Sequence, residues 1–217
     1  MIVSARRKFP AIVFITIIGF TSNLAIGQID EKKNIPQQPL LLAAEKYLNS
    51  IRSLQAYFVQ SSTTGAVSDG TLFIARPGKL RIQYKTPITL QVYANDTWLY
   101  YIDYDLREIS QIPVDKTPAS FLLRNKFRFS RELDILNTIK SHGTLRIEIA
   151  MRESAGGGSM TLIFSENIDA FLGWVVKDTQ GIKTKISLMN TKINLPIPKE
   201  LFIFSIPDWA FPADPQD

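Results

Sequence analysis

The side chains that could support catalysis in this chain are few, and they stand in stretches that we predict to be turns. His142, the only histidine, precedes Gly143 between two apolar segments, where we expect a solvated turn residue rather than a general base. Asp103 and Asp105 are a candidate pair of acids. Glycoside hydrolysis requires two carboxylates facing each other across a cleft, and two acids within one turn do not provide that geometry.

Other signatures of enzymes are missing from the sequence. The chain has no cysteine, no Gly-x-Ser-x-Gly elbow, no His-Glu-x-x-His pair and no phosphate-binding loop with a lysine. We therefore expect no catalytic residue, no bound metal and no cofactor, and we predict that the protein is not an enzyme. A periplasmic hydrolase is the remaining alternative, and turnover that is lost in His142→Ala or in single carboxylate variants would reveal it.

The first residues follow the order of a secretory signal. A basic segment, Arg6 to Lys8, precedes an apolar run from Ala11 to Phe20, and small residues follow up to Gly27. The run is shorter than the ~20 apolar residues of a membrane-spanning helix. We therefore predict a cleaved signal peptide over residues 1–27 and a protein that works in the periplasm. An uncleaved anchor is the alternative.

The remaining chain has the size of one domain. Removing 27 of the 217 residues leaves 190, within the ~100 to 200 residues of a typical domain. We predict a flexible leader over residues 28–39, one domain over residues 40–212 and a tail over residues 213–217. The signal carries three of the five net positive charges and no basic cluster follows it, so we expect no nucleic-acid partner. Without cysteine, the core forms without disulfides.

Two short helices are predicted. After Pro39, one apolar stripe at helical spacing is formed by Leu41, Ala44, Leu48 and Ile51, while Glu45, Lys46 and Asn49 are expected to face away. A second helix is expected to begin at Thr117 as N-cap, with Pro118 at its first position and Phe121 to Leu123 inside.

Most of the remaining chain alternates between apolar and polar residues, which predicts antiparallel strands. The alternating positions are Leu54, Ala56 and Phe58; Leu80, Ile82 and Tyr84; Leu145, Ile147, Ile149 and Met151; Met160, Leu162 and Phe164; Leu172, Trp174 and Val176; Ile182, Thr184, Ile186 and Leu188; and Phe202, Phe204 and Ile206. Turns are expected at the glycine run 156–158 and at Asp178 to Gly181. Residues 127–139 show no clear pattern.

An antiparallel sheet with one apolar face must cover that face. The sequence offers many amphipathic strands but only two short helices, so three covers are open: a second sheet in a sandwich, another copy of the chain, or a bound ligand such as an acyl chain. The fold class expected from the residues alone is mainly β with a few helices.

A series of short segments adds a family resemblance. The segments are Phe58-Val59-Gln60, Gly70-Thr71-Leu72-Phe73, Arg76-Pro77-Gly78-Lys79-Leu80-Arg81, Tyr84, Pro87, Asn95-Asp96-Thr97-Trp98-Leu99-Tyr100-Tyr101, Asp103-Tyr104-Asp105-Leu106, Thr117-Pro118 and Leu122-Leu123. In order and spacing this series resembles the LolA-like family of periplasmic outer-membrane lipoprotein carriers. The likeness weakens after Asn125 but continues through Gly181 to the stretch from Pro198 to Pro207.

The resemblance implies an incomplete antiparallel β-barrel whose concave apolar face is covered by a few short helices acting as a lid. It also implies a soluble carrier with acylated lipoproteins as cargo. The expected partners are an inner-membrane ATP-driven transporter that releases lipoproteins and an outer-membrane receptor, or the outer membrane itself. We expect a monomer. A lipid- or glycolipid-binding sensor module of the same fold is the alternative.

Arg76 is the residue that we predict to control the lid. It shares strand parity with Leu72 and Ile74, so its guanidinium is expected on the apolar face, bonded to backbone carbonyls at the ends of the lid helices. The resemblance implies the same role, because the arginine of the family's Arg-Pro motif holds the lid closed. We therefore predict that Arg76 and Pro118 form a lid-closing switch. A solvent-exposed Arg76 at the end of its strand is the alternative.

The residues predicted to line an acyl-chain cavity are large apolar or aromatic side chains of the expected strands and second helix. They are Ile74, Leu80, Ile82, Tyr84, Trp98, Tyr100, Leu122, Leu162, Trp174 and Ile186. Each could equally belong to an ordinary core. Ile82 departs from the family pattern, in which many members carry tryptophan at this position.

Overall fold

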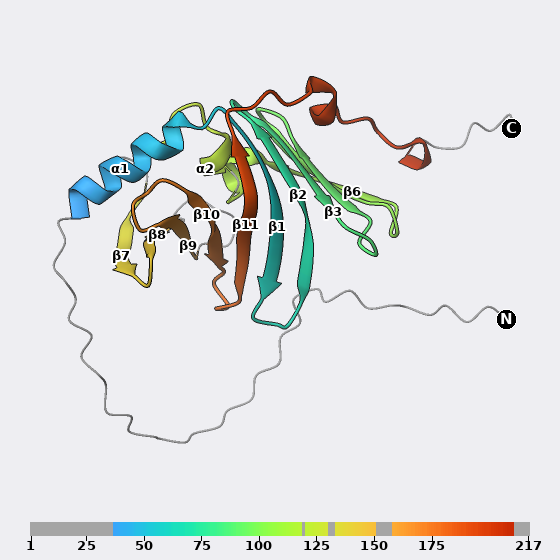
Figure 1. The fold of residues 1–217 in the computed structure, drawn as a ribbon. Helices are drawn as coiled ribbons and strands as arrows, with labels where there is room; N and C mark the ends of the chain where they lie inside the picture. Colours follow the sequence, from blue (N-terminus) through green and yellow to red (C-terminus); the bar gives the residue numbers. More distant parts are fainter. Residues whose placement is uncertain (1–36, 119, 130–132, 151–157, 211–217) are drawn as a thin grey trace, which may run out of the picture. The chain divides into compact units, whose positions relative to one another are not determined.

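The computed structural model describes residues 37–118, 120–129, 133–150 and 158–210 (Figure 1). The predicted signal peptide, the predicted leader up to residue 36, the tail over 213–217, Met151 and most of the glycine run lie outside these ranges. Within them the chain is mainly β-structure with a few short helices, as predicted.

The strands form one antiparallel sheet. In chain order they are β1 (Ser53–Ser62), β2 (Val67–Ala75), β3 (Lys79–Tyr84), β4 (Leu90–Ala94), β5 (Trp98–Asp103), β6 (Glu108–Pro113), β7 (Ile135–Ser141), β8 (Thr144–Ala150), β9 (Ser159–Ser165), β10 (Phe171–Lys177) and β11 (Lys183–Ile193). Among the described residues they pair in the order β6-β5-β4-β3-β2-β1-β11-β10-β9-β8-β7. Two meanders therefore meet at the pair of β1 with β11. In this part of the chain β6 and β7 have one partner strand each, so the sheet is open and the predicted incomplete barrel is confirmed.

The polar residues considered first as catalysts form turns, as predicted. His142 and Gly143 are exposed and both have positive φ, 50° and 71°, which suits the two central residues of a tight hairpin turn between β7 and β8. Asp103 Oδ1 accepts hydrogen bonds from the backbone N–H groups of Asp105 at 3.0 Å and Leu106 at 2.9 Å. This carboxylate closes its turn and does not face a second acid across a cleft.

The first helix, α1 (Gln37–Ser50), begins earlier than predicted and takes in Pro39. Proline is tolerated in the first turn of a helix because its missing N–H has no partner there. Ala44 and Leu48 are fully buried, and Ile51 is buried directly after the helix, so the predicted apolar stripe packs on the core.

The second helix is shorter than predicted and has a different start. A 3₁₀ turn, η1 (Val114–Lys116), comes first, and the hydroxyl of Thr117 donates back to the carbonyl of Val114 at 2.8 Å. Thr117 is therefore not the N-cap that the sequence suggested, because its side chain completes the preceding turn. The helix α2 (Ser120–Leu123) is a single turn in which Phe121, Leu122 and Leu123 are all buried.

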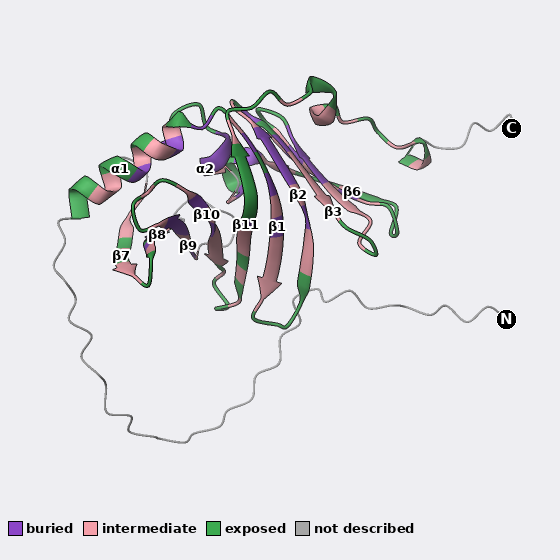
Figure 2. Ribbon diagram, viewed as in Figure 1, coloured by how far each residue is buried: buried purple, intermediate pink, exposed green. Residues whose placement is uncertain are grey.

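The core lies between α1 with α2 and one face of the sheet, which we call the inner face; the opposite face is the outer face. Leu54, Ile74 and Leu162 are examples of fully buried inner-face residues. Burying such a side chain completely stabilises the fold by about 1.5–3 kcal/mol. In Figure 2 the buried stretches of β1, β2 and β3 lie near α2, and the strands become half-buried farther along.

Strand β10 departs from the alternation predicted for it. The pairing of β9 with β10 shifts between Phe171 and Gly173, which are opposite Phe164 and Ile163. This bulge puts Phe171, not the predicted Leu172, on the inner face with Trp174, and the two rings stack with their centroids 6.1 Å apart. The alternation predicted for Leu172 is wrong for this reason.

The C-terminal segment does not form the strand predicted for Phe202, Phe204 and Ile206. It consists of the 3₁₀ turns η2 (Lys199–Phe202) and η3 (Asp208–Ala210) joined by extended chain. Phe204 packs on the outer face, with its ring centroid 4.8 Å from that of Tyr100 and 5.8 Å from that of Tyr93. Of the three apolar residues, Phe204 packs against aromatic rings, whereas Ile206 is exposed.

Candidate functional site

Arg76, directly after β2, connects the sheet to both helices. Its Nε donates a hydrogen bond to the carbonyl oxygen of Leu122 in α2 at 2.6 Å, and its Nη1 donates to the carbonyl oxygen of Leu48 in α1 at 2.6 Å. These are the backbone acceptors that the sequence analysis expected. Both carbonyls belong to the last turns of their helices, where no further N–H group of the helix is available to them.

The surroundings of Arg76 explain why its hydrogen bonds matter. Burial disfavours the charged guanidinium and lowers its pKa. An arginine stays protonated even so, and the two carbonyl oxygens replace part of the water that it has lost. The negative end of the α1 dipole adds to this attraction. The two helices, lying against the sheet, therefore supply the acceptors of the buried guanidinium.

Further polar side chains of α1 hold the segment that follows α2. The side-chain amide of Asn49 donates to the carbonyl of Phe127 at 2.9 Å and accepts from its N–H at 2.8 Å. Glu45 accepts from the N–H of Phe129 at 2.6 Å. The prediction that Glu45 and Asn49 face away from the fold is wrong, because both bond to backbone that had no predicted structure. Lys46 is exposed, as expected.

Aromatic rings fill the space beneath the helices. Phe121 of α2 contacts Phe127, Phe171 and Trp174 edge-on, with ring centroids 6.2 to 6.4 Å apart. Tyr47 of α1 meets Phe164 edge-on at 6.2 Å, and its hydroxyl accepts a hydrogen bond from the N–H of Phe171. Each such pair contributes about 0.5–1.5 kcal/mol beyond simple burial. The helices are thus held by rings as well as by Arg76.

The structure divides the predicted lining residues into three groups. Four belong to the sealed core and are at most 2% exposed: Ile74, Leu80, Leu122 and Leu162. Four more are half-buried at the margin of that core: Ile82, Tyr84, Trp174 and Ile186. The other two, Trp98 and Tyr100, lie on the outer face.

Strand β5 presents its alternate residues to opposite faces, and Leu99 and Tyr101 belong to the core. Trp98 and Tyr100 therefore face outward, and Tyr100 stacks on Phe204. We remove Trp98 and Tyr100 from the candidate cavity.

Pro118 lies half-buried in the turn between η1 and α2. Its position allows it to fix the direction of the backbone at the start of α2. The described hydrogen bonds that hold this helix are made by neighbouring residues and not by Pro118. Its part in a lid-closing switch stays a prediction.

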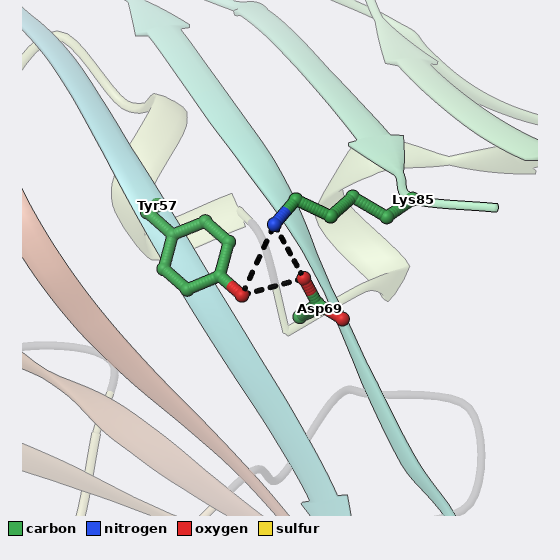
Figure 3. Close-up of polar contacts among 3 residues, drawn as sticks. All are labelled: Tyr57, Asp69 and Lys85. Carbon is green, nitrogen blue, oxygen red and sulfur yellow. Dashed lines mark hydrogen bonds and ion pairs between the residues drawn. The ribbon is translucent and has the colours of Figure 1, made fainter.

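A polar network on the outer face joins three ionisable side chains, those of Tyr57, Asp69 and Lys85 (Figure 3). Tyr57 donates a hydrogen bond to Asp69 at 2.5 Å, and the ammonium of Lys85 lies 3.1 Å from the same carboxylate oxygen. The Tyr57 hydroxyl holds the pKa of Asp69 below its usual value, and Asp69 raises the pKa of Lys85. Both groups thus stay charged near neutral pH, and the network ties β1 and β2 to the end of β3.

No cluster of three or more metal-ligating side chains is found in the described ranges. No helix in the part of the chain that the structure describes is long and apolar enough to cross a membrane.

Comparisons with known proteins point to one family. A family model described as outer membrane lipoprotein carrier protein LolA matches residues 49–205, well over half of the chain. An outer-membrane lipoprotein carrier protein of Methylococcus capsulatus is 28% identical over 193 residues, which cover 85% of this chain and 90% of the relative. A protein of the same description from Legionella pneumophila (strain Paris) is 28% identical over 170 residues, or 74% of this chain and 82% of the relative.

Solved structures of low sequence identity also resemble the chain. A LolA superfamily protein from Nitrosomonas europaea is 7% identical, with a TM-score of 0.43 over 76% of this chain and 97% of the other. MucB is 11% identical, with a TM-score of 0.44 over 77% of this chain and 62% of the other.

Proposed function

Because the chain belongs to the family of LolA outer-membrane lipoprotein carrier proteins, we propose that it binds the acyl chains of lipoproteins released from the inner membrane and delivers them to the outer membrane. The relatives from Methylococcus and Legionella carry the same description. The protein then acts by binding, not by catalysis.

The observation that carries the proposal is the double hydrogen bond of Arg76 to Leu48 and Leu122 across an apolar inner face. With the helices in place, the side chains of α2 fill the core, and Leu122 is almost fully buried. A cargo chain must therefore displace the helices before it can take their place. Arg76 loses both acceptors in that step, so it sets part of the free energy of opening.

The energies of opening and binding are compatible. Each acyl methylene removed from water contributes about 0.8 kcal/mol, so one long chain outweighs the loss of two hydrogen bonds, which are worth about 1.5–3 kcal/mol each when one group is charged. A carrier must also release its cargo, which requires lid states that differ by only a few kcal/mol. Closing the helices over the emptied inner face supplies part of the free energy of release.

We place this activity in the periplasm, after removal of residues 1–27. The cargo would come from an inner-membrane ATP-driven transporter and pass to an outer-membrane receptor or to the outer membrane itself. We propose that one monomer carries one cargo molecule, since the helices of the same chain cover the inner face.

The test is to add the purified exported protein to spheroplasts that contain an active inner-membrane transporter. Lipoproteins should appear in the soluble fraction in a stoichiometric complex with the protein. Absence of such a complex, together with extraction of free phospholipid or glycolipid, would replace the lipoprotein cargo by another lipid. Absence of both would reject the carrier function.

A further inference from the structure

The inner face changes in character along its strands. Near Arg76 its side chains are apolar and sealed, as at Leu54 and Leu80. At the other ends of β1, β3 and β5, which we call the far ends, the inner-face side chains are half-buried and several are polar. Gln60 and Tyr84 lie there, and Tyr101 lies two residues closer to the sealed end than Tyr84, in the row of Ile82. All three are on the same face as buried neighbours two or more residues away.

Gly70 brings two of these polar groups together. Tyr84 and Phe58 are its partners on either side, in β3 and β1. A Cβ at Gly70 would lie 2.9 Å from the Phe58 ring and 2.1 Å from the carbonyl oxygen of Gln83. Because that space is empty, the rings of Tyr84 and Phe58 meet edge-on over β2 at 5.3 Å, and the Tyr84 hydroxyl donates to Gln60 Oε1 at 3.0 Å.

Hydrogen-bonding capacity is left over at the far ends. Among the described residues, the side-chain amide nitrogen of Gln60 and the hydroxyl of Tyr101 have no hydrogen-bond partner. Neither atom is fully buried. Burial raises the pKa of Tyr84 to about 12, with a contribution from Tyr101, and also raises the pKa of Tyr101. Both phenols therefore stay protonated over the whole physiological range. The O–H of Tyr84 donates to Gln60 and so orients its amide, while the O–H of Tyr101 is left as a donor.

The charge of this region indicates the kind of acceptor it suits. Strand alternation places three hydroxyl side chains on the inner face beside Gln60, those of Ser62, Ser68 and Thr184. At the far ends, no lysine or arginine of the described strands β1 to β5 or β11 is on the inner face. A phosphate would favour a cationic or bidentate arginine partner. Neutral hydroxyl and amide donors suit neutral carbonyl oxygens instead.

The spacing fits one acyl chain. From Leu54 to Gln60 the strand advances six residues, about 20 Å at ~3.3 Å per residue. One leaflet of a bilayer, which holds one chain length, is about 15 Å thick. A chain with its methyl end under the helices would thus bring its carbonyl to the far ends of β1 and β3.

We infer that Gln60, Tyr84 and Tyr101 form a polar subsite that binds the ester or amide carbonyl oxygens at the head of the cargo's acyl chains. This inference rests on the proposed function, because it presumes an acyl chain on the inner face. The subsite fixes the direction of the chain and favours acylated cargo over plain hydrocarbon of the same length.

The experiment compares two probes that differ only in these carbonyls. One is a synthetic lipopeptide with ester-linked chains, and the other is its ether-linked analogue with methylenes in place of the ester carbonyls. Binding of each to the purified protein is measured by calorimetry. We expect the wild-type protein to bind the ester probe more tightly, and Tyr101→Phe to reduce that preference by about fivefold for one lost neutral hydrogen bond. Tyr84→Phe removes the bond that orients the Gln60 amide and should lower the preference as well.

Tyr57→Phe is the matched control, since Tyr57 lies on the outer face of the same strand as Gln60 and should leave the preference unchanged. An equal affinity of the wild-type protein for both probes would overturn the subsite while leaving the carrier function in place. A shift of the same size in Tyr57→Phe would also overturn it. Binding of neither probe would reject the carrier function and the subsite together.

Discussion

Arg76 joins two helices to the sheet because a guanidinium is a rigid fork. Its Nε and Nη1 direct donors to carbonyls in two different elements, at Leu122 and Leu48. A lysine ammonium is a single, strongly hydrated point charge that would lose more hydration for the same two contacts. The sequence predicted this arrangement well, because strand parity placed Arg76 on the apolar face, where a charge needs acceptors.

Replacing Arg76 by leucine should loosen the helices while the sheet stays folded. Loss of the two charged hydrogen bonds should weaken closure by at least about 3 kcal/mol, which raises the open population by on the order of 100-fold. Hydrogen exchange of the α1 amides should accelerate accordingly, and cargo transfer to acceptor membranes should fall.

Arg81→Leu is the matched control for Arg76, since Arg81 lies on the outer face, where its Nη1 donates to the carbonyl of Leu201 at 3.2 Å. It should leave exchange in α1 unchanged. Wild-type exchange and transfer in Arg76→Leu would contradict the lid role.

Asp69 should make stability depend on pH in the acid range. In the folded protein the hydrogen bond from Tyr57 lowers the pKa of Asp69. The ionised carboxylate therefore stabilises the fold fully at pH values above its pKa in the unfolded chain, about 3.9. This contribution is lost as the pH falls through the lower pKa of the folded protein. Urea unfolding of Asp69→Asn should therefore show its largest deficit at neutral pH and converge with the wild type as the pH falls through the lowered folded pKa of Asp69. Asp105→Asn, in an exposed turn, serves as control; a deficit of Asp69→Asn that does not change with pH would refute the assignment.

At the scale of elements, period-two alternation identified the strands better than it identified their faces. Strands β3, β8 and β11 follow their predicted alternation because one of their faces is clearly polar. On β5 both faces are apolar or aromatic, with Trp98 and Tyr100 outward and Leu99 and Tyr101 inward. Alternation alone could not choose between these sets, since the outer face is itself covered there by Phe204.

The other misses have the same physical origin in tertiary contacts. The bulge at Phe171 and the packing of residues 199–210 on the outer face depend on partners far away in sequence. Glu45 and Asn49 are four residues apart beside the apolar stripe of α1, which is the spacing of side chains on one helix face. From the sequence, that spacing could have indicated that the two side chains share a partner, which is the segment from Phe127 to Phe129.

Asn49→Ala should detach this segment from α1. The substitution removes both hydrogen bonds to Phe127 and leaves a half-buried N–H and carbonyl without a protein partner, at a cost of about 1–3 kcal/mol. Urea unfolding of the purified protein measures the loss. Lys46→Ala on the exposed side of the same helix should change stability by less than about 0.5 kcal/mol. Equal stability of the two variants would show that the contacts to Phe127 contribute nothing.

For the whole molecule, the open sheet combines a sealed end with a half-open end. The helices, Arg76 and the aromatic rings close the inner face where its residues are fully apolar. The far ends remain half-buried and carry Gln60 and Tyr84, with Tyr101 two residues closer to the sealed end. An acyl chain is divided in the same way, into a long apolar body and a polar head. When the helices move aside, the apolar end of the inner face matches the body and the far ends match the head.

This division predicts two different effects of truncating inner-face side chains. Leu162→Ala creates a cavity at a fully buried position and should cost about 2–5 kcal/mol of unfolding free energy. Ile186→Ala, at the half-buried margin, should cost clearly less stability but weaken binding of an acylated probe, because that side chain can contact a bound chain without any rearrangement of the core. Urea unfolding and calorimetry on both variants separate the two effects. Tyr100→Ala, on the outer face, should leave probe binding unchanged, and a loss of affinity there equal to that of Ile186→Ala would place the acyl chain outside the inner face.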